Sequence, residues 1–276
     1  MTGVTFALIV IVVTAILSLI MCVGWAVWRR TLNSGWIDAT WTFGLGGTGL
    51  FGALGPFVLS GAVTTRQILV ATLVFAWSLR LGLHIVLRTI RIADDPRYAK
   101  LVRAWGAAAS LQMLALVQKQ AIVSVPLVMS VLLAAWNPAP LPRVQDLLAV
   151  CILMVGIAGE TVADIQLRRF RAASANRDRV CDVGLWAWSR HPNYFFEWLG
   201  WVAYPLFATD LGGSYPWGWV AIAGPACMYW LLVHVSGIPP LEEHMLERRR
   251  DAFRAYQART SAFLPLPPRS IGASSQ

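Results

Sequence analysis

The chain has 276 residues, of which 57% are hydrophobic and only 13% are charged, and its formal net charge is +9. A soluble domain typically carries about 25% charged residues, so this composition excludes an ordinary soluble domain. The apolar residues fall into blocks of about 18 residues or more, the length that crosses a bilayer core of about 30 Å. We therefore expect an all-α integral membrane protein of about seven helices. Residues 1–267 are predicted to form a single multi-pass domain, followed by a disordered tail at 269–276.

Seven apolar segments are predicted to span the membrane: residues 4–28, 36–60, 66–87, 109–135, 146–164, 193–208 and 217–235. The first run has no basic segment before it and ends at Arg29 and Arg30 instead of at small residues, so we expect a spanning helix and not a cleaved signal peptide. The fourth segment is interrupted by Gln118-Lys119-Gln120, which favours a broken or re-entrant helix. After the last span, the polar stretch 241–257 is predicted to be a helix lying along the cytosolic surface.

The distribution of lysine and arginine predicts the orientation of these spans. With the N-terminus outside, most of the 23 basic residues fall in cytosolic loops and in the tail, and only Arg66 and Arg143 fall outside. Cytosolic loops of membrane proteins carry such an excess, so the C-terminal tail is predicted to be cytosolic. For a bacterial protein the membrane would be the inner one. Insertion topology explains the net positive charge without a nucleic-acid partner, and the expected partners are membrane lipids and a lipid-like small molecule.

Several common motifs carry no function here. The four cysteines and four histidines show no metal-ligand spacing, so neither a metal site nor a disulfide is expected. The stretch 44–49 matches GxGxxG, but the dinucleotide-binding motif requires a preceding strand and a βαβ unit. Small residues inside a membrane span instead favour close packing of helices.

Two groups of polar residues lie at the predicted cytosolic ends of the spans. Glu160, Asp164, Arg168 and Arg171 follow one another at helical spacing and form one stripe. Such a stripe indicates either ion pairs on a solvated face or the wall of a ligand cavity, and both interpretations stay open. The second group follows Pro192, where Asn193 and Glu197 share a helix face and would suit a carboxamide or a ribose hydroxyl. An interfacial anchor rich in aromatic residues is the alternative.

The run 184–197, GLWAWSRHPNYFFE, together with GIPPLEEH at 237–244 and the spacing of Tyr256, Thr260, Phe263 and Pro265, resembles the C-terminal half of the steroid 5α-reductase superfamily, in particular its bacterial branch. The resemblance is specific over residues 155–265. Its characterised members are membrane reductases of about seven helices. They hold NADPH in a cytosol-facing cavity and reduce a conjugated carbon–carbon double bond in a lipid or steroid. The resemblance therefore implies an NADPH-dependent oxidoreductase acting on CH–CH groups, with 155–265 as the cofactor-binding half.

Carried over by position, the resemblance gives eleven residues a place in the NADPH site: Asp164, Arg168, Arg171, Arg179, Arg190, Asn193, Tyr194, Glu197, Glu243, Arg249 and Tyr256. The steroid-reducing members also carry an adjacent Gln-Glu pair in the second helix, where the substrate carbonyl is polarised. This chain has only apolar residues and glycine over 51–57, so it departs from the steroid pattern there. The candidates for the substrate-side acid are Asp38, Tyr98 and Tyr204.

Two other classes of protein remain as alternatives. Membrane methyltransferases of the isoprenylcysteine or phospholipid type share the Arg-His-Pro-x-Tyr signature, which is present here at 190–194. The arginines of this half suit the polyanionic NADPH better than the sulfonium of S-adenosylmethionine. A non-catalytic transporter or scaffold is the third class, although transporters typically show internal repeats and the sequence shows none.

Overall fold

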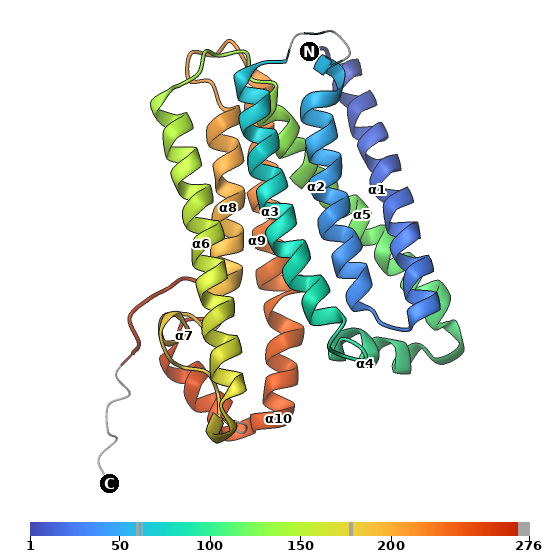
Figure 1. The fold of residues 1–276 in the computed structure, drawn as a ribbon, viewed down its shortest axis with the longest axis vertical. Helices are drawn as coiled ribbons and strands as arrows, with labels where there is room; N and C mark the ends of the chain where they lie inside the picture. The colour runs from blue at the N-terminus through green and yellow to red at the C-terminus, as the bar shows by residue number, and fades with distance from the viewer. Residues whose placement is uncertain (59–60, 62, 177–178, 270–276) are drawn as a thin grey trace. The chain divides into compact units, whose positions relative to one another are not determined.

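The computed structural model describes residues 1–58, 61, 63–176 and 179–269, and over these residues it is helical (Figure 1). Within that part of the chain, extended structure is limited to one isolated bridge between Ser189 and Ser261. The predicted all-α class is thus confirmed. Most of the predicted disordered tail, residues 270–276, lies outside the described residues.

Five helical stretches of the described chain are long and apolar enough to cross a membrane: α1 (Gly3–Thr31), α3 (Thr65–Thr89), the stretch Pro96–Ala135, α6 (Val144–Ala172) and the stretch Pro216–Arg259. The second stretch contains α4 (Pro96–Trp105), η1 (Gly106–Ala108) and α5 (Ala109–Ala135). The last contains η3 (Pro216–Ile222), α9 (Ala223–Trp230), the π-helical turn η4 (Leu231–Val235) and α10 (Ile238–Arg259). These lengths and compositions establish a multi-pass membrane protein.

The other helical segments are α2 (Gly35–Val58), η2 (Ser174–Asn176), the short α7 (Leu185–Trp188) and α8 (Pro192–Ala208). Over the described residues, helices thus lie on all seven predicted spans, and α8, with 17 residues, is as short as the sequence indicates. Residues 59–60, the end of the second predicted span, lie outside the described residues. The stretch 241–257, expected to be a helix, lies within α10, which is kinked at Arg249, where the backbone is non-helical.

The prediction of a broken fourth span is wrong, because α5 runs as one helix through Gln118-Lys119-Gln120. The two glutamine side chains find polar partners on other helices. Ser18 of α1 donates to Gln118 Oε1 at 2.5 Å, and Gln120 Nε2 donates to the hydroxyl of Tyr98 at 3.0 Å. Because Gln118 and the amide nitrogen of Gln120 bond polar groups of other helices, these residues do not interrupt the helix.

The chain divides into two compact units. Unit 1 comprises Met1–Ala149 and Tyr204–Cys227, and unit 2 comprises Val150–Ala203 and Met228–Gln276. In unit 1, α2 packs against α1, α3 and α5, and α5 also packs against α1 and α3. Glycines make these approaches close: a Cβ atom added at Gly46 would lie 2.2 Å from Ser78 Cβ, and one at Gly44 would lie 2.5 Å from Ile20 Cγ2. This contact confirms close packing as the role of most of the 44–49 stretch.

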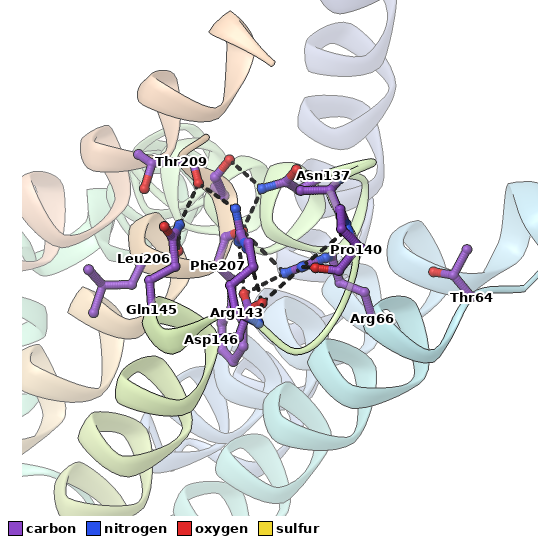
Figure 2. A network of polar contacts seen from close by, with 12 residues as sticks. Thr64, Arg66, Asn137, Pro140, Arg143, Gln145, Asp146, Leu206, Phe207 and Thr209 are labelled. Atoms are coloured by element: carbon purple, nitrogen blue, oxygen red, sulfur yellow. Dashed lines mark hydrogen bonds and ion pairs between the residues drawn. The ribbon is translucent and has the colours of Figure 1, made fainter. Parts of the chain in front are cut away.

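A buried ionic cluster closes one end of unit 1 (Figure 2). Arg66, the second residue of α3, donates from Nη1 and Nη2 to the two carboxylate oxygens of Asp146 at 2.7 and 3.0 Å. Arg143 donates to the same carboxylate from Nε at 3.0 Å and from Nη2 at 2.8 Å. Arg66 and Asp146 are only 3% and 2% exposed, so this is a fully internal ion pair.

The same cluster satisfies the last carbonyl groups of α8, which have no partner within the helix. Arg143 donates to the carbonyls of Phe207 and Thr209, and Asn137 donates to that of Phe207 at 2.8 Å. Gln145 bonds the carbonyl of Thr209 at 2.6 Å. Cations at a helix C-terminus also interact favourably with the helix dipole. The side chains of 137–146 therefore cap α8 and join it to α3 (Figure 2).

In unit 2, glycines bring α6 and α8 into contact. A Cβ atom at Gly156 would lie 2.8 Å from the carbonyl oxygen of Phe196 and 2.9 Å from the backbone nitrogen of Gly200. The segment after α6 returns onto it, since Trp186 Nε1 donates to the carbonyl of Ala163 at 3.0 Å. This packing holds the start of α8 close to the last turns of α6.

Candidate functional site

In unit 1, two of the three candidate acids are hydrogen-bonded to each other. The hydroxyl of Tyr98, on α4, donates to Asp38 Oδ1, on α2, at 2.9 Å. Tyr98 is 7% exposed, and its oxygen accepts from Gln120 Nε2 of α5 at 3.0 Å. Arg97 Nη2 bonds the other oxygen of Asp38 at 3.0 Å. These four residues, from three helices, are called the Asp38 cluster below.

The loop between α3 and α4 fixes the Asp38 cluster in place. Asp95 caps the start of α4 by accepting from the backbone N–H of Arg97, and it also bonds the side chain of Arg97. Burial alone would raise the pKa of Asp95, but the hydrogen bonds and charge of Arg97, with the charge of Arg88, lower it below its ordinary value. The backbone N–H of Ser34, just before α2, donates to the carboxylate of Asp94, the residue before Asp95, at 2.8 Å. Charge-assisted hydrogen bonds thus join the α3–α4 loop to the starts of α2 and α4.

The side-chain oxygen of Gln120 is an unsatisfied hydrogen-bond acceptor in this cluster. Its Oε1 atom is buried and has no hydrogen-bond partner among the described residues. Most buried side-chain oxygens in proteins accept a hydrogen bond from protein or water. An acceptor of this kind next to a tyrosine–carboxylate pair is a feature expected where a ligand or water binds.

Tyr204, the third candidate acid, lies at the opposite end of unit 1. It is 2% exposed and stands one helical turn before Phe207, whose carbonyl belongs to the ionic cluster of Figure 2. Helix α3 joins the two ends, from Arg66 in that cluster to Arg88 beside Asp38. At 1.5 Å per residue these arginines are about 33 Å apart along the helix. The structure therefore brings Asp38 and Tyr98 together and leaves Tyr204 apart from them.

In unit 2, the predicted site residue Arg190 is bonded to the protein itself. Its Nε donates to Glu242 Oε1 at 2.7 Å and its Nη2 to Glu242 Oε2 at 3.2 Å. Its Nη1 donates to the carbonyl of Thr260 at 2.6 Å. Gln257 Nε2 adds a bond to Glu242 at 2.7 Å. The guanidinium group of Arg190 therefore joins α10 and the segment after it to the segment before α8.

His191 completes this arrangement. Its Nε2 lies 3.0 Å from Glu242 Oε1, and because a carboxylate only accepts, Nε2 carries the proton. Burial lowers the pKa of His191 below its ordinary value, although Glu242 opposes the shift, so the ring is neutral at pH 7. The ring stacks on Tyr194 with centroids 5.5 Å apart. Its buried Nδ1 has no hydrogen-bond partner among the described residues.

Tyr256, another predicted cofactor residue, is 2% exposed and bonds the backbone of the same segment. Its hydroxyl donates to the carbonyls of Trp186 and Ser189. The backbone N–H of Arg190 in turn donates to the carbonyl of Ser261 at 2.8 Å. The C-terminal region therefore frames residues 186–191 from one side.

The remaining predicted cofactor residues differ in exposure. Glu197 is buried and accepts from Trp201 Nε1 at 2.9 Å. The half-buried residues are Asp164, Asn193, Tyr194 and Arg249, and the exposed ones are Arg168, Arg171, Arg179 and Glu243. All of them belong to unit 2, as the resemblance to a C-terminal cofactor half implies. Their binding of NADPH stays a prediction.

Glu242 is the residue of this arrangement that the sequence prediction missed, since its neighbour Glu243 was chosen. Glu242 accepts from Arg190, His191 and Gln257, whereas Glu243 is exposed. Helical spacing from the buried Phe253 does not identify Glu242, because the backbone of Arg249, which lies between them, is non-helical (φ −139°, ψ 45°). The contacts of Glu242 with Arg190 and His191 join positions about fifty residues apart, so no local pattern in the sequence signals them.

Comparisons with known proteins give one match. No curated protein and no solved structure matches the chain. A family model described as "Protein of unknown function (DUF1295)" matches residues 24–260, which include both the Asp38 cluster and the Glu242 contacts. The chain therefore belongs to the DUF1295 family.

Proposed function

We propose that the chain is a membrane-embedded, NADPH-dependent reductase that reduces a conjugated carbon–carbon double bond in a lipid- or steroid-like substrate, as its resemblance to the steroid 5α-reductases implies. The observation that supports this best is the hydrogen bond between Tyr98 and Asp38 at 2.9 Å. It offers a tyrosine and a carboxylate that could polarise a carbonyl in a chain that has no Gln-Glu pair over 51–57. The pair lies near the first turn of α2 instead of deep within it.

The side chains of unit 2 fit a dinucleotide phosphate. Arg168, Arg171 and Arg179 present exposed guanidinium groups, the side chain best suited to phosphate. Asn193 and Glu197 stand one turn apart on α8 and offer an amide and a buried carboxylate to a carboxamide or ribose. Arg190 and Tyr256 are bonded to the protein, and we assign them to positioning the start of α8.

When bound, NADPH supplies a hydride to the β-carbon of the substrate. Negative charge then develops on the carbonyl oxygen of the enone, where a hydrogen-bond donor lowers the barrier. The hydroxyl proton of Tyr98 would turn from Asp38 to that oxygen. The N–H of Gln120 already donates to the Tyr98 oxygen and would stabilise the charge left on it, while Arg97 holds Asp38 in position.

The test is the thermal stability of the purified protein in detergent with added nucleotide. A ligand at about 100 times its dissociation constant stabilises the folded state by about 2.7 kcal/mol. We expect a rise in the melting temperature with NADPH, none with S-adenosylmethionine, and loss of the rise in Asn193→Ala. Asp210→Asn, on an exposed loop, is the control and should keep the rise.

Tyr98→Phe separates cofactor binding from catalysis. It should keep the NADPH-dependent rise but lower NADPH consumption with a long-chain enone by roughly 10²–10⁴-fold, the range for loss of a general acid. A melting temperature raised by S-adenosylmethionine and not by NADPH would instead favour a methyltransferase. Unchanged consumption in Tyr98→Phe would remove the Asp38 cluster from the mechanism.

A further inference from the structure

Unit 1 contains an apolar cleft that the proposed reaction does not use. It has a volume of about 650 Å³ and lies between α1 and α2, with Leu132 of α5 and its C-cap residue Trp136 contributing to the lining. On α1 it is lined from Thr5 to Ile20, and on α2 from Phe43 to Gly52. Its size is typical of ligand sites, which are about 300–1,000 Å³.

The walls of the cleft offer no polar partner to an occupant. Its lining contains no charged residue. The hydroxyl of Thr48 donates to the carbonyl of Gly44 at 2.7 Å, and the indole of Trp136 donates to the carbonyl of Gly52 at 3.2 Å. The hydroxyl of Thr5 is 2.9 Å from that of Thr2. Because these polar atoms are already bonded within the protein, the cleft suits a hydrocarbon.

The length and position of the cleft indicate which hydrocarbon. From Thr5 to Ile20 the lining extends about 22 Å along α1. One leaflet of a bilayer contributes about 15 Å of hydrocarbon, so an acyl chain could lie in the cleft along the helix axis. Val12 and Ile16 of the lining are 54% and 40% exposed, and their helix is a candidate membrane span. The medium around them is therefore acyl chains.

Gly47 keeps the cleft open. Other glycines of the 44–49 stretch contact neighbouring helices, as Gly46 does with Ser78 and Gly49 with Val131. A Cβ atom added at Gly47, in contrast, would meet nothing within 4 Å. The missing side chain at this position is therefore unnecessary for helix packing, and it leaves space that the cleft occupies.

We propose that this cleft binds one acyl chain of a bilayer lipid, which remains with the protein as a resident lipid between α1 and α2. In a membrane, an apolar chain gains no hydrophobic energy by leaving other lipid tails, so retention depends on van der Waals contact. A flat helix face touches a chain on one side, whereas this cleft touches it from α1, α2 and α5. Summed dispersion contacts then favour the cleft over bulk lipid. This inference does not depend on the proposed reductase activity.

The experiment uses a phosphatidylethanolamine with a photoactivatable diazirine in one acyl chain, added to the full-length protein in dioleoylphosphatidylcholine nanodiscs. After irradiation, the adducts are mapped by mass spectrometry. We expect them to concentrate on Val12 and Phe43 of the cleft, above the level at Phe75, a lipid-facing residue of α3 that is 50% exposed. Gly47→Leu should lower the cleft adducts to the Phe75 level.

Gly55→Leu is the matched control, because Gly55 also has open space around it, lies on α2 and does not line the cleft. It should leave the adducts unchanged. Val12→Trp fills the cleft from α1 and replaces Gly47→Leu if that variant does not fold. Cleft adducts no more frequent than those at Phe75, or unaffected by both filling variants, would overturn the proposal. Displacement of the labelled lipid by a long-chain enone, but not by a saturated alcohol of equal length, would also overturn it by identifying a substrate chain.

Discussion

The adjacent residues Glu242 and Glu243 show how strongly the environment decides what a carboxylate does. Glu242 accepts hydrogen bonds from Arg190 and Gln257 and contacts the buried ring of His191. Glu243 follows it by one residue, a rotation of about 100° around the helix, and is exposed. Glu242 thereby joins α10 to the segment that leads into α8.

Replacing each of these carboxylates by an amide should separate their roles. Glu242→Gln leaves the guanidinium of Arg190 half-buried without its counter-charge, and removing one partner of a buried pair typically costs about 3–5 kcal/mol. Because Glu242 retains some exposure, 13% of its side chain, we expect about 3 kcal/mol. The melting temperature in detergent should fall by roughly 6–12 °C, while Glu243→Gln should change it little. Equal effects of the two variants would contradict the assignment.

The sequence predicted which residues to consider for the candidate site, but it did not predict which of them contact one another. The cost of ionisable groups in a membrane singled out Asp38 from the sequence, and Tyr98 was a second candidate acid. Their hydrogen bond could not be predicted, because it joins positions 60 residues apart and depends on how the α3–α4 loop folds. Arg190 and Tyr256, which the resemblance places in the NADPH site, bond groups of the protein itself. Sequence patterns cannot tell whether an arginine will bind a phosphate or a carboxylate of its own chain, since both offer the same anionic oxygens.

At the scale of helices, apolar length predicted where each helix lies, and the partners of the polar residues determined where that prediction failed. The glutamines of α5 suggest a break only when α5 is considered alone, because its partners Ser18 and Tyr98 lie on other elements. The C-terminus of α8 was likewise not predictable in detail. Its last carbonyls are capped by Asn137, Arg143 and Gln145, which precede those carbonyls by more than sixty residues.

Two substitutions in the ionic cluster that caps α8 should destabilise the protein to different degrees. Asp146→Asn leaves the buried guanidinium of Arg66 and the half-buried one of Arg143 without a counter-charge and should cost about 3–5 kcal/mol. Arg66→Met removes one cation but leaves Asp146 paired with Arg143 at 2.8 Å, so a smaller loss of about 1–3 kcal/mol is expected. Chemical or thermal unfolding in detergent measures both. A larger loss for Arg66→Met than for Asp146→Asn would show that Asp146 does not organise the cluster.

At the scale of the whole chain, the same cluster bears on the orientation in the membrane. Arg66 and Arg143 are the two arginines that the proposed topology leaves outside, and both are bonded to the carboxylate of Asp146. Exposed arginines lie instead in segments assigned to the cytosol: Arg29, Arg30, Arg91, Arg103, Arg168 and Arg169. The two exceptions to the positive-inside rule therefore have a structural role, capping α8. That role strengthens the proposal of an external N-terminus and a cytosolic tail.

Thiol labelling in intact cells tests this orientation. Leu211 lies between α8 and η3 and is 80% exposed, and Ala173 lies just after α6 and is exposed. Helix α6 is long enough to cross the membrane, and the proposed topology puts Leu211 outside and Ala173 inside. A membrane-impermeant maleimide should therefore label Leu211→Cys in intact cells and Ala173→Cys only after permeabilisation, with the unsubstituted protein as the baseline. The reverse pattern would invert the topology and put the exposed arginines of unit 2, and with them the proposed NADPH site, on the side of the membrane that lacks the cofactor.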